Sequence, residues 1–179
     1  MALVLLTGGA RSGKSALALR LASEQGAPVV FLATAQARDE EMEARIARHR
    51  DERHGFWRTI EEPLRLREAI EEADGGHCLI VDCLTLWTAN ALERFGAEDA
   101  EVRAAAAAAS AAARTGATIV VTNEVGLGLV PDSPLGRSYR DLLGRVNAIW
   151  AEAADRAFLL VAGRALALES TDSLAEGLR

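Results

Sequence analysis

Apolar residues along this chain gather in short continuous runs, separated by longer segments in which apolar and polar residues recur with a helical period. The runs occupy residues 3–7, 29–33, 78–83, 118–123 and 157–162. Continuous apolar runs of this length are typical of strands that are buried on both faces of a parallel sheet. Their alternation with helical segments predicts an α/β fold with a mostly parallel sheet flanked by helices.

The segments between the runs predict helices, mainly by apolar periodicity and by helix propensity. We expect them at residues 16–24, 39–53, 63–73, 84–95, 98–115 and 134–154. Pro63 is expected in the first turn of its helix, and Gly116 just beyond the end of another. After a turn at Gly163, residues 165–168 are expected to return as an antiparallel edge strand. No linker or internal repeat interrupts this order, so we expect one domain over residues 1–179.

Composition narrows the class of protein. The chain has 179 residues, half of them hydrophobic, and a net charge of -6. This acidic balance argues against a protein that binds nucleic acid through its bulk charge. The first apolar run is too short for a transmembrane helix and has no charged segment before it, so we expect a cytoplasmic protein without membrane insertion. Cys78 and Cys83 are expected to be reduced core residues rather than a disulfide or a metal pair.

A phosphate-binding loop follows the first run. The chain from Gly8 to Ser15 matches the P-loop pattern G-x-x-x-x-G-K-[ST] between a strand and a helix start. Glycines let backbone N–H groups point inward around an anion, and the helix start adds its unpaired N–H groups and positive dipole end. In this pattern Lys14 reaches the β- and γ-phosphates and the Ser15 hydroxyl ligates Mg²⁺. The alternative is a glycine-rich turn that binds nothing.

One feature of composition favours the phosphate-binding interpretation. Lys14 is the only lysine in the chain, and every other basic side chain apart from histidine is arginine. A compact ammonium suits a phosphate as a mobile point charge, whereas the planar guanidinium of arginine suits bidentate pairing. The choice of lysine at this position alone is therefore consistent with a P-loop.

Asp82 ends the buried run at residues 78–83, which is the Walker-B arrangement downstream of a P-loop. Its carboxylate would hold Mg²⁺ directly or through water. The alternative is that Asp82 caps the helix that follows. The end of the second run, at residues 33–35, is expected beside the P-loop, because ligands bind at the carboxyl ends of parallel strands.

A strongly charged helix is expected at residues 39–53. Met42, Ile46, His49 and Arg53 recur along one stripe of it, and Arg45 lies four residues before His49. These side chains could face one ligand, or His49 could be incidental on a solvated helix.

Glu61 could likewise contact a ligand or cap the helix after Pro63, and the sequence favours capping. A glycine-rich segment at residues 124–131 is a candidate lid or substrate contact.

Taken together, these motifs resemble the bifunctional adenosylcobinamide kinase / adenosylcobinamide-phosphate guanylyltransferase family. The resemblance rests on the P-loop, residues 33–35, the charged helix with His49, Trp57-Arg58-Thr59, the Thr122-Asn123-Glu124-Val125-Gly126 loop and Gly144-Arg145-Val146-Asn147. It extends to about Leu168. The His49 helix and the Asn-Glu-Val-Gly loop are much more selective than the P-loop.

The resemblance implies a RecA-like P-loop fold, a homotrimer, and two reactions. A nucleoside triphosphate, ATP or GTP, phosphorylates adenosylcobinamide, and GTP with Mg²⁺ then donates GMP through a guanylylated histidine, which is His49 by motif position. Lys14 is the second catalytic residue, and Ser15 and Asp82 are the metal ligands. The nucleotide contacts implied by motif and resemblance are Gly8, Gly9, Ala10, Arg11, Ser12, Gly13, Lys14, Ser15, Ala33, Thr34, Ala35, Arg50, Arg53, Glu61 and Asp82.

Two alternatives remain at this point. The chain could be a small-molecule kinase without guanylyl transfer, or a nucleotide-dependent switch. The histidine itself also has rivals, because His54 follows the charged helix closely. His77 is less suitable, since it precedes a strand at what should be the opposite end of the sheet.

Overall fold

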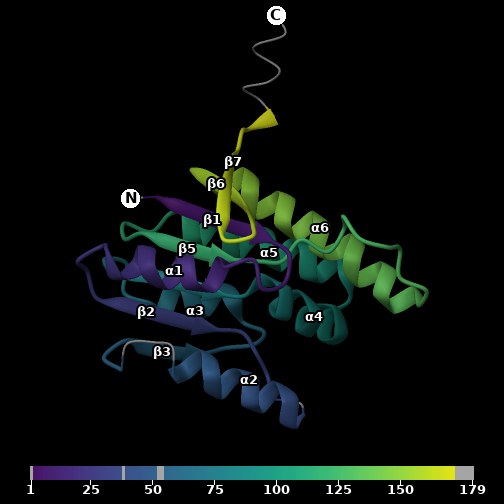
Figure 1. Ribbon diagram of the computed structural model, residues 1–179, viewed down its shortest axis with the longest axis horizontal. Coiled ribbons are helices and arrows are strands. Elements are labelled where there is room, and N and C mark those ends of the chain that lie inside the picture. The colour runs from purple at the N-terminus through teal and green to yellow at the C-terminus, as the bar shows by residue number, and fades with distance from the viewer. Residues whose placement is uncertain (1, 38, 52–54, 172–179) are drawn as a thin grey trace, which may run out of the picture.

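In the computed structural model, which describes residues 2–37, 39–51 and 55–171, one sheet of seven strands forms the centre (Figure 1). Its order is β3-β2-β4-β5-β1-β6-β7, and every neighbouring pair is parallel except β6 and β7. The predicted mostly parallel sheet with an antiparallel C-terminal edge strand is therefore confirmed. The strands are β1 (Leu3–Gly8), β2 (Val29–Ala33), β3 (Arg58–Glu61), β4 (Cys78–Asp82), β5 (Thr118–Val121), β6 (Arg156–Val161) and β7 (Arg164–Leu168).

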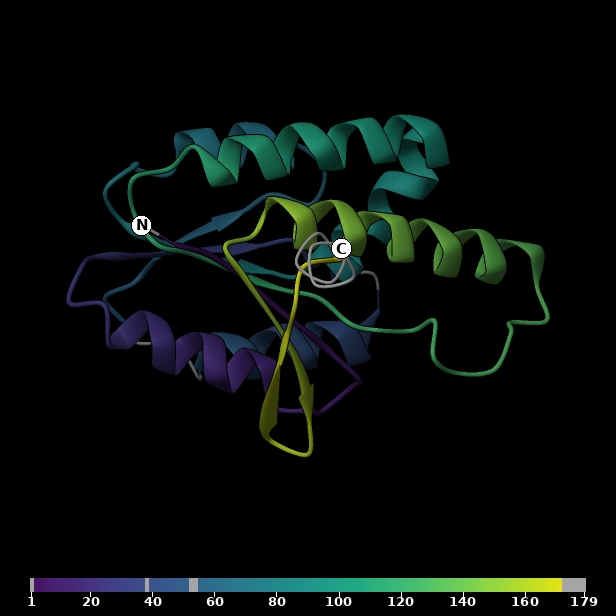
Figure 2. The ribbon, with the colours of Figure 1, turned by 90° about the horizontal axis from the view of Figure 1, so that it is seen from above.

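Helices cover both faces of this sheet (Figure 2). One face carries α3 (Leu66–Glu72), α4 (Leu84–Phe95), α5 (Ala97–Ala112) and α6 (Pro134–Ala153). The other carries α1 (Lys14–Ser23), while α2 (Glu40–Asp51) lies beside the β3 edge. Among the described residues, no helix combines the length and the apolar character needed to cross a bilayer.

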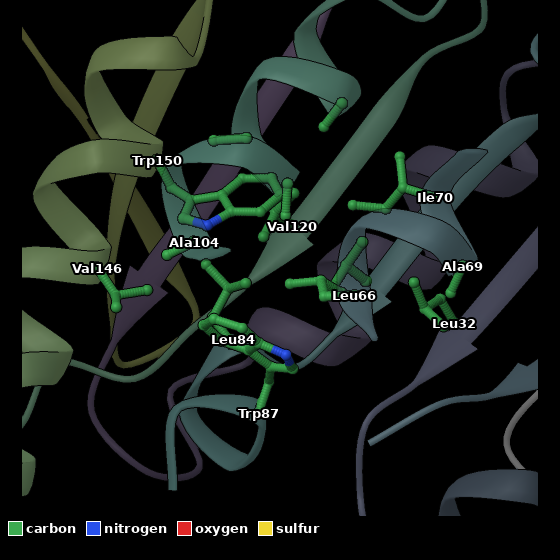
Figure 3. Packing of buried hydrophobic residues seen from close by; sticks show 14 of the residues in the cluster. Leu32, Leu66, Ala69, Ile70, Leu84, Trp87, Ala104, Val120, Val146 and Trp150 are labelled. Atoms are coloured by element: carbon green, nitrogen blue, oxygen red, sulfur yellow. The ribbon is translucent and has the colours of Figure 1, made fainter. Parts of the chain in front are cut away.

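Alternate residues of the central strands point to opposite faces and build two cores. Leu5, Val81 and Val120 pack toward α3–α6, whereas Leu6 and Val121 pack toward α1. This double burial explains why the strands are continuous apolar runs. The larger core surrounds two fully buried indoles, Trp87 and Trp150 (Figure 3). Alanines on one side of α5 are fully buried and let this helix pack closely against α3 and α6.

The edge strand β3 is the element that the hydrophobic pattern does not predict. Arg58, Thr59 and Glu61 are exposed and only Ile60 is half-buried, so no apolar run marks the strand. Pairing with β2 alone holds it in the sheet. An edge strand without a buried face carries little sequence signal, because backbone hydrogen bonds rather than side chains define it.

The helix after Pro63 starts later than predicted. α3 begins at Leu66, so Pro63 precedes it rather than lying in its first turn. The carboxylate of Glu62 accepts hydrogen bonds from the backbone N–H groups of Leu64 (3.0 Å) and Arg65 (2.9 Å). These bonds, with those from the Arg65 side chain, hold the pKa of Glu62 below its ordinary value despite the opposing effect of burial. Glu62, and not Glu61, therefore satisfies the start of this helix.

Candidate active site

A cavity of about 540 Å³ lies at the carboxyl ends of the parallel strands. It is the position at which open α/β sheets bind ligands. The cavity is bordered by the P-loop, the ends of β2, β4 and β5, and helix α2. Its lining residues are Ala10, Arg11, Ser12, Gly13, Lys14, Ser15, Ala16, Ala33, Ala35, Ala37, Met42, Glu43, Ile46, Ala47, Arg50, Glu61, Asp82, Cys83, Leu86, Val121 and Asn123.

Two P-loop glycines are required by the backbone. Gly8 has φ +143°, and a Cβ atom there would lie 2.3 Å from the carbonyl oxygen of Leu160 on β6. Gly13 has φ +98° and stands at the N-terminal end of α1. L-residues with side chains rarely adopt these φ values, so the sequence pattern of the loop follows from its geometry. Gly8 and Gly9 do not line the cavity themselves.

The Lys14 side chain folds back over the loop. Its Nζ donates hydrogen bonds to the carbonyl oxygens of Gly8 (2.8 Å) and Gly9 (2.7 Å) and to Ser12 Oγ (3.2 Å). The residue is only 6% exposed, yet it borders the cavity. A buried ammonium held by carbonyl dipoles and facing a cavity is a strong local positive charge, suited to an anionic ligand.

Thr34 joins the ends of β2 and β4. Its hydroxyl donates to the carbonyl oxygen of Cys83 (2.7 Å) and accepts from the Cys83 N–H (2.9 Å), and its own N–H donates to the carbonyl oxygen of Asp82 (3.2 Å). The Asn90 amide donates to the Thr34 carbonyl (3.0 Å). Thr34 is fully buried and is absent from the cavity wall. It holds the backbone beside Asp82 in place, while Ala33 and Ala35 form the wall.

Strands β4 and β5 separate β2 from the P-loop strand β1, so residues 33–35 share the cavity edge but are not adjacent to the P-loop strand.

Cys83 brings a thiol, a potential nucleophile, to the cavity, and its environment suppresses that reactivity. Burial, with the negative charge of neighbouring Asp82, raises the pKa of the Cys83 thiol to about 11. The thiolate is the reactive form of cysteine, so this side chain is essentially unreactive near pH 7. Both cysteines are free thiols, as the sequence predicts, but only Cys78 is a buried core residue, because Cys83 is half-buried at the cavity.

Helix α2 forms the outer wall of the cavity. Met42, Ile46 and Arg50 lie along one side of the helix and border the cavity. The helix starts at the Asp39 carboxylate, whose oxygen accepts from the Met42 N–H (2.7 Å). The Arg50 guanidinium donates to the Glu61 carboxylate at the end of β3, and this ion pair ties the helix to the sheet edge. Glu61 is thus a cavity residue, and the ligand-facing alternative for it is the one that the geometry favours.

His49 belongs to α2, three residues after Ile46 and directly before Arg50. The side chains of His49 and Arg45 lie outside the part of the chain that the structure describes, and so do residues Arg53 and His54. His77 precedes β4, at the sheet edge opposite the cavity, as its sequence position predicts.

Asn123 is a cavity residue that the sequence analysis noted only as part of a loop. Its N–H donates to Thr85 Oγ1 (2.7 Å) and its carbonyl accepts from the Asn147 amide (3.0 Å). Asp82 and Val121 are direct partners across β4 and β5, which brings Asn123 to the same edge as the Asp82 carboxylate. A polar residue directly after a buried strand is the signal that could have identified it.

Comparisons with known proteins agree with this geometry. A family model described as cobinamide kinase / cobinamide phosphate guanyltransferase matches residues 4–168. The bifunctional adenosylcobalamin biosynthesis protein CobP of Pseudomonas aeruginosa is 46% identical over 166 residues, which cover 92% of this chain and 96% of that protein. The proteins named CobU of Escherichia coli and Salmonella typhimurium, also described as bifunctional adenosylcobalamin biosynthesis proteins, are 37% and 38% identical, each over 90% of this chain and 96% of their own. The chain is therefore an enzyme that belongs to the cobinamide kinase / cobinamide phosphate guanyltransferase family.

Proposed function

We propose that this chain uses ATP or GTP to phosphorylate the aminopropanol hydroxyl of adenosylcobinamide. It then transfers GMP from GTP to that phosphate, which gives adenosylcobinamide-GDP and pyrophosphate. One cavity serves both nucleotide-dependent steps. The observation that carries the proposal is that the P-loop and the helix bearing His49 border the same cavity, through Lys14 on one side and Ile46 and Arg50 on the other.

The P-loop is proposed to hold the triphosphate. Backbone N–H groups from Ala10 to Ser15, up to the start of α1, supply the anion site, and Lys14 neutralises the charge that accumulates on the outer phosphates. Its ammonium already lies among the loop carbonyls, within side-chain reach of a phosphate in the cavity. Arg50 and Arg53, with Glu61, Ala33 and Ala35, are proposed as further nucleotide contacts, whereas the buried Thr34 supports the strand ends beside them.

The residues present suit magnesium. Ser15 and Asp82 are hard oxygen donors and both border the cavity. The described residues contain no group of three or more His, Cys, Asp or Glu side chains that could hold a metal ion by itself. Magnesium fits such a sparse donor set, because it keeps water ligands and binds through one or two protein oxygens together with substrate phosphates. When bound, it would neutralise phosphate charge at the reacting centre.

His49 is proposed as the covalent carrier of GMP. A neutral imidazole nitrogen attacks the α-phosphorus of GTP, so that a P–N bond forms and the P–O bond to pyrophosphate breaks. An oxygen of adenosylcobinamide phosphate then attacks the same phosphorus, forms the new P–O bond and releases the imidazole. Lys14 and the loop N–H groups stabilise the departing pyrophosphate.

We also propose that the protein works in the cytoplasm as a homo-oligomer, which is a trimer by the family resemblance. Supporting this, both faces of the edge strand β7 are exposed, and Val161 and Leu166 are each 63% exposed. An unpaired strand edge with exposed apolar side chains favours association with another chain. Light scattering coupled to size-exclusion chromatography measures the state directly, and a monomer at micromolar concentration would contradict it.

Incubation with GTP labelled at the α-phosphate tests the covalent step. We expect a label on the protein that is labile in acid and stable in base, and that His49→Ala abolishes. His54→Ala and His77→Ala are the matched controls and should keep the label. Absence of label on intact wild-type protein would contradict guanylyl transfer and leave a kinase or a nucleotide switch. Phosphorylation of cobinamide then separates these two, because only the kinase catalyses it.

A further inference from the structure

The segment that follows β5 carries an apolar surface that the described core leaves uncovered. Leu127 is 84% exposed, Leu129 is 95% exposed and Val130 is 62% exposed, and Leu135 at the start of α6 is 70% exposed. Figure 2 shows this segment extending from the end of β5 before it returns to α6. Four large apolar side chains within nine residues form an exposed patch of the kind that marks a binding surface.

Both ends of the segment are held firmly, which fixes the position of the patch. At the β5 end, the Glu124 N–H donates to the carbonyl oxygen of Gly8 in the P-loop (3.1 Å). At the other end, the Arg137 guanidinium donates to the carbonyl oxygens of Pro131 (3.0 Å) and Asp132 (2.8 Å). The segment is thus attached to the phosphate-binding loop itself, and its exposed leucines are not on an unanchored tail.

The patch begins a short distance along the chain from the cavity. Asn123, the residue before Glu124, is part of the cavity wall, and Val121, two residues earlier, is paired with Asp82. Leu127 follows Asn123 by four residues, and four residues of chain span at most about 14 Å. A broad substrate whose reacting hydroxyl enters beside Asp82 can therefore reach residues 124–130. Helix α2 borders the cavity on another side.

The chemistry of the acceptor matches this surface. Cobinamide is a broad macrocycle whose rim carries methyl groups between its amide side chains, and only its aminopropanol hydroxyl must reach the phosphate. Among the described residues, none that lines the cavity is aromatic. The indoles of Trp57, Trp87 and Trp150 are buried, and Phe56, although exposed, precedes β3 at the opposite edge of the sheet. On the segment after β5, the exposed apolar side chains that can contact the macrocycle are aliphatic.

We infer that residues 124–130, with Leu127 and Leu129 as the main contacts, form the binding surface for the corrin macrocycle, with Asn123 at its boundary with the nucleotide cavity. This inference rests on the proposed function, since it places the acceptor of the same reactions. The segment then sets the affinity for the corrinoid without contributing to the affinity for the nucleotide.

The test compares Leu127→Ser/Leu129→Ser with Val102→Ser, which alters a 70% exposed apolar residue on α5. Two readouts are used: binding of cobinamide by equilibrium dialysis, and steady-state phosphorylation with cobinamide or nucleotide varied. For the loop variant we expect the Kd and KM for cobinamide to rise about tenfold or more, because two leucines lose their contact with the ligand. The KM for nucleotide and the label from GTP should stay unchanged, and Val102→Ser should behave as wild type.

The other outcomes either overturn the inference or contradict the proposed function while leaving the inference in place. Unchanged cobinamide affinity in an active loop variant overturns the inference alone. A loop variant with a changed oligomeric state, or with a raised KM for nucleotide, also overturns it, because the segment is then a subunit contact or part of the nucleotide site. Wild-type protein that binds cobinamide in a loop-dependent manner, but takes no label from GTP, supports the inference and contradicts the proposed guanylyl transfer.

Discussion

The backbone N–H of Gly163 donates a hydrogen bond of 3.0 Å to the carbonyl oxygen of Ser12, so the turn between β6 and β7 supports the phosphate-binding loop. Ala162 (φ +50°) and Gly163 (φ +75°) both adopt left-handed conformations in this turn. The Cα atom of Gly163 is also 3.5 Å from where a Cβ on Gly13 would lie. The position of the loop therefore depends on a hairpin at the other end of the sequence.

Replacing Gly163 by valine should weaken nucleotide binding. A β-branched residue is strained at positive φ by about 1–3 kcal/mol, and the turn would have to move away from Ser12. We expect a KM for GTP raised several-fold and a lower melting temperature. Gly26→Val is the control, because Gly26 has a similar φ of +66° with nothing near its Cβ position. An equal loss of nucleotide affinity in both variants would show a general effect of destabilisation.

The variants Gly8→Ala and Gly9→Ala should differ in stability, because a side chain is sterically excluded at Gly8 and not at Gly9. At Gly8 the new methyl group would meet the Leu160 carbonyl oxygen at 2.3 Å, so β1 and β6 must move apart. At Gly9 nothing lies within 4 Å of the Cβ position. We expect Gly8→Ala to lower the free energy of unfolding by at least about 2 kcal/mol and Gly9→Ala to change it by less than about 0.5 kcal/mol. Urea titration measures both, and similar values would contradict the steric account.

The sequence predicts the elements whose signal is local. The P-loop is recognisable because its chemistry lies in consecutive residues, and the buried strands because each is an apolar run. β3 is missed because Arg58–Glu61 has almost no buried side chain. Asn123 and Leu86 border the cavity because the order of the strands in the sheet brings their segments there. The hydrogen bond between Gly163 and Ser12 likewise joins segments that are far apart in the sequence. No local pattern encodes contacts of this kind.

The ion pair between Arg50 and Glu61 should matter for catalysis more than for stability. Both side chains are 55% exposed, and exposed pairs contribute about 0–1 kcal/mol. Glu61→Gln should therefore leave the free energy of unfolding nearly unchanged. It should slow labelling by GTP several-fold, because α2 loses its link to the end of β3. The control is Glu72→Gln, which breaks the ion pair between Arg58 of the same strand and Glu72 of α3, away from the cavity. Equal rates of labelling in the two variants would contradict this role.

Stability should fall at alkaline pH because the pKa of each cysteine thiol is raised in the folded protein. Burial raises the pKa of Cys78 to about 11, and burial with the Asp82 charge does the same for Cys83, against an ordinary value of 9.0. A raised pKa in the folded state stabilises the protein fully below pH 9, and this contribution is lost as the pH rises through 11. The loss amounts to about 2–3 kcal/mol for each thiol.

Urea unfolding followed by tryptophan fluorescence from pH 7 to 11 measures this loss. Cys78→Ala should remove somewhat less than half of the decrease between pH 9 and 11, since the Cys83 thiol remains and burial also raises the pKa of Tyr139 to about 12. A decrease of the same size in Cys78→Ala and wild type would show that other groups cause it.

Asp82→Asn should raise the magnesium concentration needed for half-maximal labelling by about tenfold or more, because a neutral amide replaces a charged oxygen ligand. The N-cap residue of α4 is Cys83, and asparagine suits a helix start about as well as aspartate does, so any support that Asp82 gives to this start would survive the change. The variant therefore separates the two roles that the sequence leaves open for Asp82. Glu43→Gln removes another carboxylate from the cavity wall and should leave the magnesium requirement unchanged. If Asp82→Asn keeps the wild-type magnesium dependence while Asp82→Ala lowers the free energy of unfolding by about 1 kcal/mol, Asp82 supports the start of α4 and is not a metal ligand.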